Sequence, residues 1–171
     1  MRLGLGARRV WWAWSTGLIV LGFIEALVLH LIGNGLLPGP VAVALDVVVG
    51  AATLALLVVF VSPLWSAHTV SDDGVAHLRL GLLGSVVVRP GDVAQARTYT
   101  PTAIKPAEPG VGFDEETGRL SLVRSPTSPL VLLTFTHPVP ARMQVFRRVL
   151  ATECLVGTDD AQRLLGVLAG G

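Results

Sequence analysis

Two long apolar runs without Lys or Arg dominate the first third of the chain, at residues 11–32 and 41–61. Each has about 21 residues, the length that a helix needs to cross a hydrocarbon core of about 30 Å. After residue 62, apolar and polar residues alternate in short stretches separated by Gly, Pro and acidic turns. Such alternation is typical of half-buried strands. The pattern therefore predicts a transmembrane hairpin at 11–62 and a β-rich domain at 63–171.

Six stretches of the second part have the pattern of strands. They cover residues 68–70, 75–80, 85–89, 119–124, 130–135 and 149–156. The segment 100–116 is rich in Pro, Gly and acid and is expected to be a long loop, while Pro138 and Pro140 are expected to interrupt the sheet. A final helix is predicted after Asp160 from apolar residues that recur at helical spacing, namely Ala161, Leu164, Leu165 and Leu168.

The composition agrees with a membrane protein. Apolar residues make up 51% of the 171 residues and charged residues only 15%, whereas an average soluble domain has about 25% charged residues. The formal net charge is +1, which provides no bulk attraction to nucleic acid. We therefore expect the lipid bilayer, and no nucleic acid, among the partners.

The distribution of charge around the two apolar runs predicts their orientation. Three arginines precede the first run (Arg2, Arg8 and Arg9), and the loop at 33–40 has no charge. Short loops rich in Lys and Arg stay in the cytoplasm. Residues 1–10 and 63–171 are therefore expected on the cytoplasmic side of the plasma (inner) membrane, with two passes between them.

Tryptophan placement supports this orientation. The first run opens with three tryptophans and the second is followed by one: Trp11, Trp12, Trp14 and Trp65. All four would lie at the inner interface, where aromatic side chains form a belt.

Two carboxyl groups interrupt the apolar runs. Glu25 lies about 10 Å, and Asp46 about 7.5 Å, from the outer ends of the predicted spans. An ionised carboxylate at the centre of a span costs at least about 2.5–3.5 kcal/mol. Because both carboxyls sit at nearly the same level of an antiparallel hairpin, they are candidates for a shared polar site with Thr53. His30 is a further polar group near the outer surface, on a different face from Glu25.

Three roles remain open for this intramembrane site. The two carboxyls can bond to each other, with at least one protonated, and hold the helices together. They can instead contact a partner helix or a ligand. They can also carry a proton or cation, although one hairpin has few walls with which to enclose a pathway.

The order of elements after the hairpin resembles a known group of bacterial domains. The segments that carry the resemblance are HLRLGLLGSVVV at 77–88, GRLSLV at 118–123, PLVLLTF at 129–135 and TDDAQRLLGVL at 158–168. The chain resembles the actinobacterial proteins in which a pleckstrin-homology-like (PH-like) domain hangs from a two-helix membrane anchor. The resemblance implies a mainly-β PH-like barrel closed by a C-terminal helix, a fold whose eukaryotic members bind lipid headgroups or proteins. Between the first strands only Arg79 and Arg89 are basic.

One basic cluster lies further along the chain. Arg142, Arg147 and Arg148 flank Met143 and Phe146, which makes this segment a candidate for contact with an anionic membrane surface, at about 1 kcal/mol per basic residue. A solvated loop is the alternative.

Catalytic and metal-binding signatures are missing from the sequence. The one cysteine, Cys154, lies in an apolar stretch typical of a buried thiol. His68, His77 and His137 are far apart and have no metal-like spacing with acidic residues. No phosphate-binding or hydrolase motif is present. We therefore expect no cofactor and no metal, and the sequence does not favour enzyme chemistry.

Three hypotheses for function follow. The first is a non-enzymatic accessory or scaffold protein, whose domain binds a protein partner while Glu25 and Asp46 assist assembly with a second copy or another membrane protein. The second is an anionic-lipid-binding module that acts through the segment 142–148. The third is a small membrane enzyme or ion carrier that uses the two carboxyls.

Overall fold

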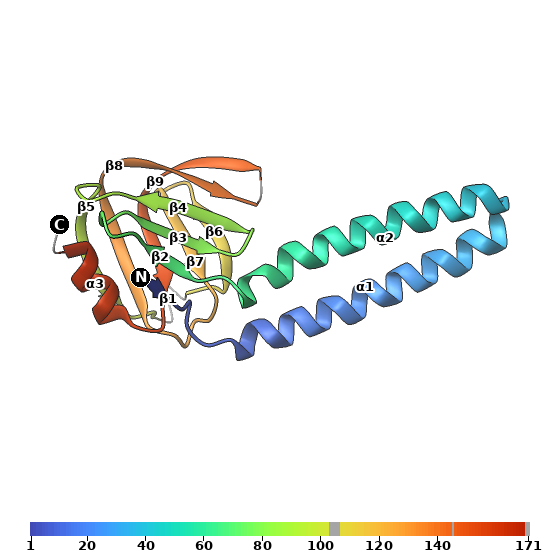
Figure 1. The fold of residues 1–171 in the computed structure, drawn as a ribbon, viewed down its shortest axis with the longest axis horizontal. Coiled ribbons are helices and arrows are strands. Elements are labelled where there is room, and N and C mark those ends of the chain that lie inside the picture. Colours follow the sequence, from blue (N-terminus) through green and yellow to red (C-terminus); the bar gives the residue numbers. More distant parts are fainter. Residues whose placement is uncertain (103–106, 145, 170–171) are drawn as a thin grey trace.

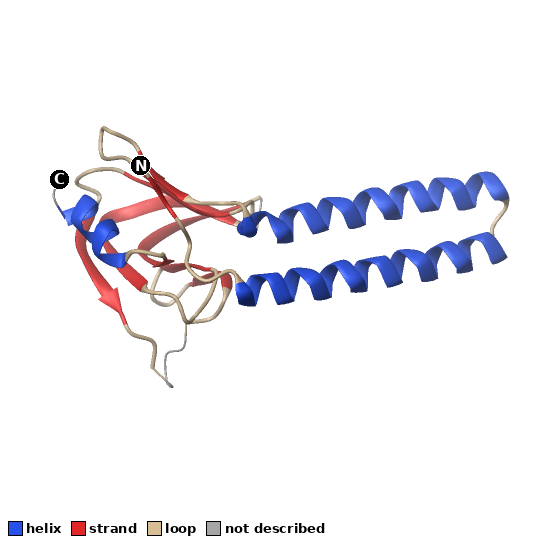
Figure 2. Cartoon of the chain, turned by 60° about the horizontal axis from the view of Figure 1, so that its bottom comes forward, coloured by secondary structure: helices blue, strands red, loops and turns tan. Residues whose placement is uncertain are grey.

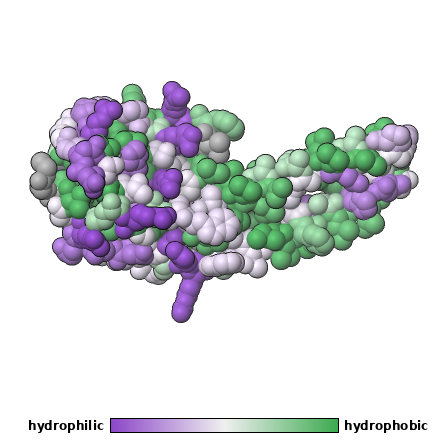
Figure 3. All heavy atoms as spheres, in the orientation of Figure 1, coloured by the Kyte–Doolittle hydropathy of each residue, from purple (hydrophilic) through white to green (hydrophobic). Residues whose placement is uncertain are grey.

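The computed structural model describes residues 1–102, 107–144 and 146–169. Two long helices, α1 (Arg9–Leu36) and α2 (Gly39–Val61), run side by side away from a β domain (Figures 1 and 2). Both are long and apolar enough to cross a membrane, and almost none of either apolar stretch is buried within the protein. Their side chains form an apolar surface along the hairpin (Figure 3). This exposure distinguishes them from the core helices of a soluble protein.

The turn between the helices is shorter than the sequence suggested. The predicted spans at 11–32 and 41–61 lie inside the helices, but α1 continues through Leu36 and α2 already begins at Gly39. Leu37 is extended, with φ −110° and ψ 151°. A proline disfavours the helical conformation in the residue before it, and Pro38 follows Leu37.

The remaining chain forms a mainly-β domain with nine strands in its described part. They are β1 (Arg2–Leu3), β2 (His68–Val70), β3 (Ala76–Leu80), β4 (Gly84–Val88), β5 (Val93–Tyr99), β6 (Gly110–Asp114), β7 (Arg119–Val123), β8 (Leu130–Met143) and β9 (Arg147–Gly157). A short 3-10 helix, η1 (Ser62–Leu64), links α2 to β2, and α3 (Ala161–Ala169) packs beside β5 and β8, at the end of the domain away from the hairpin (Figure 1).

The strands form an open sheet rather than a closed barrel. Its order is β1-β2-β3-β4-β8-β9-β7-β6, with β5 paired to β8. Neighbours are antiparallel except for β7 and β9, which are parallel. The sheet curves around an apolar core that also receives Leu164 of α3; its largest fully buried apolar side chains include Leu78, Leu80, Leu120, Leu122 and Leu133.

Several elements differ from the sequence-based expectation. Residues 1–3 of the expected cytoplasmic tail join the sheet, since β1 pairs with β2. The stretch Val93–Tyr99 was not predicted, and the expected loop at 100–116 contains β6; residues 103–106 of that loop, and residues 170–171 of the expected domain, lie outside the described chain.

The two prolines expected to interrupt the sheet lie within β8. Pro138 falls between Thr134 and Val139, where the register between β8 and β9 shifts. A proline lacks the N–H that a regular ladder uses, and an irregular stretch tolerates this loss. Pro140 lies opposite Leu150 after the ladder resumes. Both prolines therefore lie within one continuous strand instead of ending it.

Two groups considered for chemistry are core residues. Cys154 is fully buried, and desolvation raises the pKa of its thiol well above the usual range, so the thiol stays protonated. His68 is also fully buried: its Nε2–H donates to the Gly157 carbonyl at 2.9 Å, and its Nδ1 accepts from the Arg79 N–H at 3.2 Å. Burial lowers the pKa of His68. With both nitrogens bonded in the neutral form, this histidine is structural.

A buried arginine fixes the β domain to the base of the hairpin. Arg124 follows β7 and is 1% exposed. Its guanidinium donates to the carbonyl of Pro63, at 3.2 Å, and to that of Gly6. Because Gly6 precedes α1 and Pro63 follows α2, one side chain holds both ends of the hairpin. Burial lowers the pKa of Arg124, and nearby Arg8 adds to this effect.

The turn between β3 and β4 makes a second connection. Ser62 Oγ accepts from the Leu82 N–H at 2.7 Å, and Ser66 Oγ accepts from the Gly81 N–H at 2.9 Å. Gly81 has φ +58°, and a Cβ there would lie 2.1 Å from Ser62 Oγ and 2.6 Å from the Pro63 nitrogen. This glycine lets the turn approach the end of α2 closely.

Candidate functional site

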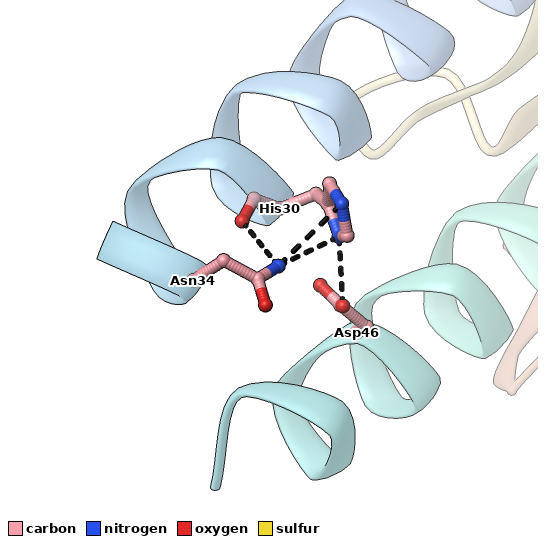
Figure 4. Close-up of polar contacts among 3 residues, drawn as sticks. All are labelled: His30, Asn34 and Asp46. Atoms are coloured by element: carbon pink, nitrogen blue, oxygen red, sulfur yellow. Dashed lines mark hydrogen bonds and ion pairs between the residues drawn. The ribbon is translucent and has the colours of Figure 1, made fainter. Parts of the chain in front are cut away.

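A polar cluster lies at the end of the hairpin away from the β domain (Figure 4). His30 of α1 and Asp46 of α2 bond through Nδ1 and Oδ2 at 2.8 Å. Asn34, one turn after His30, donates from Nδ2 to the His30 carbonyl at 2.9 Å. The Asn34 Nδ2 also lies 3.1 Å from the His30 Nδ1. The cluster ties the two helices together near their turn.

The expected pairing of Asp46 with Glu25 is not formed. Gly22 packs against Thr53, and Gly33 packs against Leu45, which places Asp46 opposite His30. The two carboxyls lie at different distances from the turn because the helices are longer than predicted. Glu25 lies eleven residues, about 16.5 Å, before the end of α1, whereas Asp46 lies seven residues, about 10.5 Å, after the start of α2. The sequence-based depths were measured from residues 32 and 41, whereas the helices end and begin at Leu36 and Gly39.

Glu25 instead has no polar partner on α2. Its side chain is exposed and makes no hydrogen bond or ion pair within the described part of the chain. Thr53 belongs to the helix contact, because a Cβ at Gly22 would lie 3.1 Å from its methyl carbon. The structure thus brings His30 and Asp46 together near the turn, and leaves Glu25 as a separate, exposed carboxyl in the middle of α1.

The tryptophans lie at the opposite end of the hairpin, beside the β domain. Three of them are exposed, by 57–71% of their surface: Trp12, Trp14 and Trp65. Trp11 is buried and its Nε1–H donates to the Phe60 carbonyl at 2.8 Å. Three side chains are therefore free to form the expected belt, while Trp11 joins the two helices at their base.

The register of the sheet assembles a row of arginines that sequence reasoning missed. Arg79 lies opposite Ser85, Ser85 opposite Arg142, and Arg142 opposite Arg148. Directly opposed residues share one face of a sheet, so three exposed arginines occupy opposed positions on one face of β3, β4, β8 and β9. We call this set, Arg79, Arg142 and Arg148, the arginine row. Only the strand pairing, which joins distant segments, could have revealed it.

The third arginine of the predicted basic cluster has a different partner. Arg147 bonds through Nη2 to Glu115 Oε1, at 2.6 Å, in the turn between β6 and β7. Arg142 and Arg148 lie on β-strands rather than in a loop. Since two like charges directly opposite each other destabilise a strand pair, their arrangement favours an anionic ligand between them.

The arginine row borders a shallow hollow on the outer face of the sheet. The hollow has a volume of about 440 Å³, and its polar lining consists of Thr69, Ser71, His77, Arg79, Ser85 and Arg142. No Asp or Glu among the described residues lines it. Arg79 is held by a hydrogen bond from its Nε to the Ala67 carbonyl at 3.3 Å. Hydroxyl and guanidinium donors around one hollow suit a phosphate or carboxylate.

The row lies close to the base of the helices. Arg79 is two residues, about 7 Å, from Gly81, which bonds to Ser66 just after α2. The turn after β8 is adjacent, because the Gln144 N–H donates to the Leu83 carbonyl at 2.7 Å. Each turn carries an exposed apolar side chain, Leu82 (42%) and Phe146 (91%). Basic and apolar groups therefore gather on the side of the domain from which the helices extend.

No group of three His, Cys, Asp or Glu side chains that could hold a metal ion occurs among the residues that the structure describes. Comparisons of the chain with known protein families, with curated proteins and with solved structures find no match.

Proposed function

We propose that this is a non-enzymatic, membrane-anchored accessory protein that assembles with a second membrane chain through Glu25 while its β domain engages a partner at the inner face. Glu25, exposed in the middle of α1 and without a polar partner in the described chain, carries the proposal. A carboxyl within the hydrocarbon core is unfavourable by at least about 2.5–3.5 kcal/mol, and α2 offers it no partner. A polar group on a neighbouring helix, from a second copy or another membrane protein, removes much of this penalty.

The arrangement of the domain supports the proposed orientation. Both ends of the hairpin join one β domain (Figure 1), so both lie on one side of a membrane that the helices span. Arg2, Arg8 and Arg9 lie on that same side, and positive charge favours the cytoplasm. We also propose a PH-like identity for the domain; a mainly-β sheet followed by one helix supports it.

Replacing Glu25 with leucine is expected to weaken the complex roughly tenfold, because one interhelical polar contact contributes about 1–2 kcal/mol in model systems. Native mass spectrometry of the full chain, gently extracted from its own membranes, measures the fraction in complex. Asp46→Asn is the matched control, since its carboxyl already bonds within the chain to His30. Monomers in wild type and variant alike would contradict the proposal.

The arginine row supports a second candidate function, the recognition of anionic lipid by the membrane-facing side of the β domain. A domain held at the base of the hairpin keeps the row near the headgroups, and Phe146 lies at the tip of the same β8–β9 hairpin. This function is compatible with assembly through Glu25, because Glu25 lies in the middle of α1 and the arginine row lies on the β domain.

The double variant Arg142→Gln/Arg148→Gln is expected to reduce enrichment of anionic lipid around the protein by about 30-fold, since two arginines contribute about 2 kcal/mol. The full chain is reconstituted in nanodiscs that contain phosphatidylglycerol and phosphatidylcholine, and co-purified lipid is quantified after detergent extraction. Arg147→Gln is the control, because Arg147 pairs with Glu115. Equal losses in both variants would indicate only an effect of net charge.

A further inference from the structure

An apolar pocket lies where the hairpin meets the β domain. It has a volume of about 410 Å³, which is within the range of about 300–1,000 Å³ for small-molecule sites. Its apolar walls come from both helices and from the sheet: Trp11, Trp14, Leu18, Phe60, Leu83 and Val111. Residues far apart in sequence therefore form one cavity at the expected level of the inner membrane surface.

The pocket continues along α1. A second hollow of about 400 Å³ shares Trp14 and Leu18 with it and extends past Gly17 to Leu21. From Trp11 to Leu21 the helix rises about 15 Å. We call the two hollows together the junction groove. One end of this groove lies against the β domain, and the other opens onto the apolar surface of the hairpin.

Polar groups occur only at the end beside the β domain. Ser15 lines the pocket, is 1% exposed, and its Oγ has no hydrogen-bond partner among the described residues. A buried hydroxyl without a partner is unfavourable by about 1–3 kcal/mol. Gln144, with φ +50°, also lines this end. The groove is thus amphipathic along its length, which matches a ligand with one polar end and an apolar tail.

We propose that the junction groove binds one acyl chain, with the carboxyl or ester oxygen of that chain near Ser15 and its tail directed toward Leu21. The proposal rests on the membrane location proposed above. An ester lipid of the inner leaflet and a free fatty acid share this chemistry. Such an acyl chain would fill the space between α1 and the sheet and fix the angle at which the β domain meets the hairpin.

Gly17 and Gly35 provide a matched pair of test positions. Both are exposed glycines of α1, and a Cβ added at either has no atom within 4 Å. Gly17 lines the junction groove, whereas Gly35 lies at the other end of the helix. Phenylalanine at either position is thus compatible with the helix, but only Gly17→Phe fills the groove.

The full chain is placed in nanodiscs doped either with phosphatidylglycerol bearing a mid-chain diazirine or with a diazirine fatty acid, then irradiated and mapped by peptide mass spectrometry. We expect labelling concentrated on residues 11–21 and 109–111, reduced about tenfold by Gly17→Phe, the ratio that corresponds to about 1.4 kcal/mol, and unchanged by Gly35→Phe. Labelling by only one of the two probes identifies the source of the chain.

Even labelling of both helices, or labelling insensitive to Gly17→Phe, would overturn the proposal. So would a protein chain that covers residues 11–21 in place of lipid. Retention of both variants in carbonate-washed membranes separates this outcome from failure of the membrane location itself.

Discussion

Replacing Arg124 with alanine is expected to lower the thermal unfolding midpoint of the detergent-solubilised full chain by about 10 °C. The substitution removes two charge-assisted hydrogen bonds and leaves the carbonyls of Gly6 and Pro63 buried without this donor. Such bonds contribute about 1.5–3 kcal/mol each, so the free energy of unfolding should fall by about 3–5 kcal/mol. For a chain of this size, 1 kcal/mol corresponds to about 2–4 °C.

The control for this experiment is Arg89→Ala, which removes an exposed arginine just after β4. Near-ultraviolet circular dichroism reports on the tryptophans at the base of the hairpin. Arg124→Lys should fall between wild type and alanine, because one ammonium group cannot reproduce the two-pronged guanidinium contact. An unchanged midpoint in Arg124→Ala would show that the carbonyls find other donors and that the junction does not depend on this side chain.

Gly81→Ala is expected to have the second large effect. An added Cβ would lie 2.6 Å from the Pro63 nitrogen and 2.7 Å from the Ser62 carbonyl carbon, and backbone atoms cannot rotate away as a side chain can. The turn must therefore withdraw from α2 and lose the bond between the Leu82 N–H and Ser62 Oγ. Hydrogen exchange of the full chain should accelerate in residues 79–85.

Gly91→Ala separates the clash from backbone strain. Gly91 also has positive φ, +90°, but nothing lies within 4 Å of an added Cβ. Both variants replace a glycine of positive φ, but only Gly81→Ala also creates a steric clash. This clash should lower the free energy of unfolding by a further amount of about 1–3 kcal/mol. Equal exchange rates around residues 79–85 in the two variants would show that the close approach is not needed.

The helices and most strands could be predicted from local patterns. A long apolar run marks each helix of the hairpin, and a strand with one buried face alternates between apolar and polar residues. The two apolar runs identify α1 and α2, and alternation identifies β3 and β7. β6 was not predicted, because Gly110 and Gly112 interrupt the alternation of apolar and polar side chains. Its strand conformation depends on pairing with β7, which the sequence does not reveal. β8 was cut short because proline normally ends a strand, yet a shift in register accommodates Pro138.

Which residues meet in the candidate sites is decided by the pairing of helices and strands rather than by composition. Glu25 and Asp46 were expected to meet because the ends of the helices were estimated from hydropathy, and a few residues of helix turned Asp46 toward His30 instead. Arg79 and Arg142 are far apart in sequence and become neighbours only through pairing of β3, β4 and β8. Arg147 and Arg148, by contrast, are neighbours in the sequence but have different surroundings, since Arg147 bonds to Glu115.

The pairing of β1 with β2 has a consequence for biosynthesis. The strand Arg2–Leu3 is made before either helix, but its partner His68–Val70 is made only after both. This edge of the sheet can therefore form only after both helices have been synthesised, and its pairing closes a loop that contains the whole hairpin. The β domain is therefore complete only when the hairpin has brought its two ends together, so folding of the sheet depends on prior pairing of the helices.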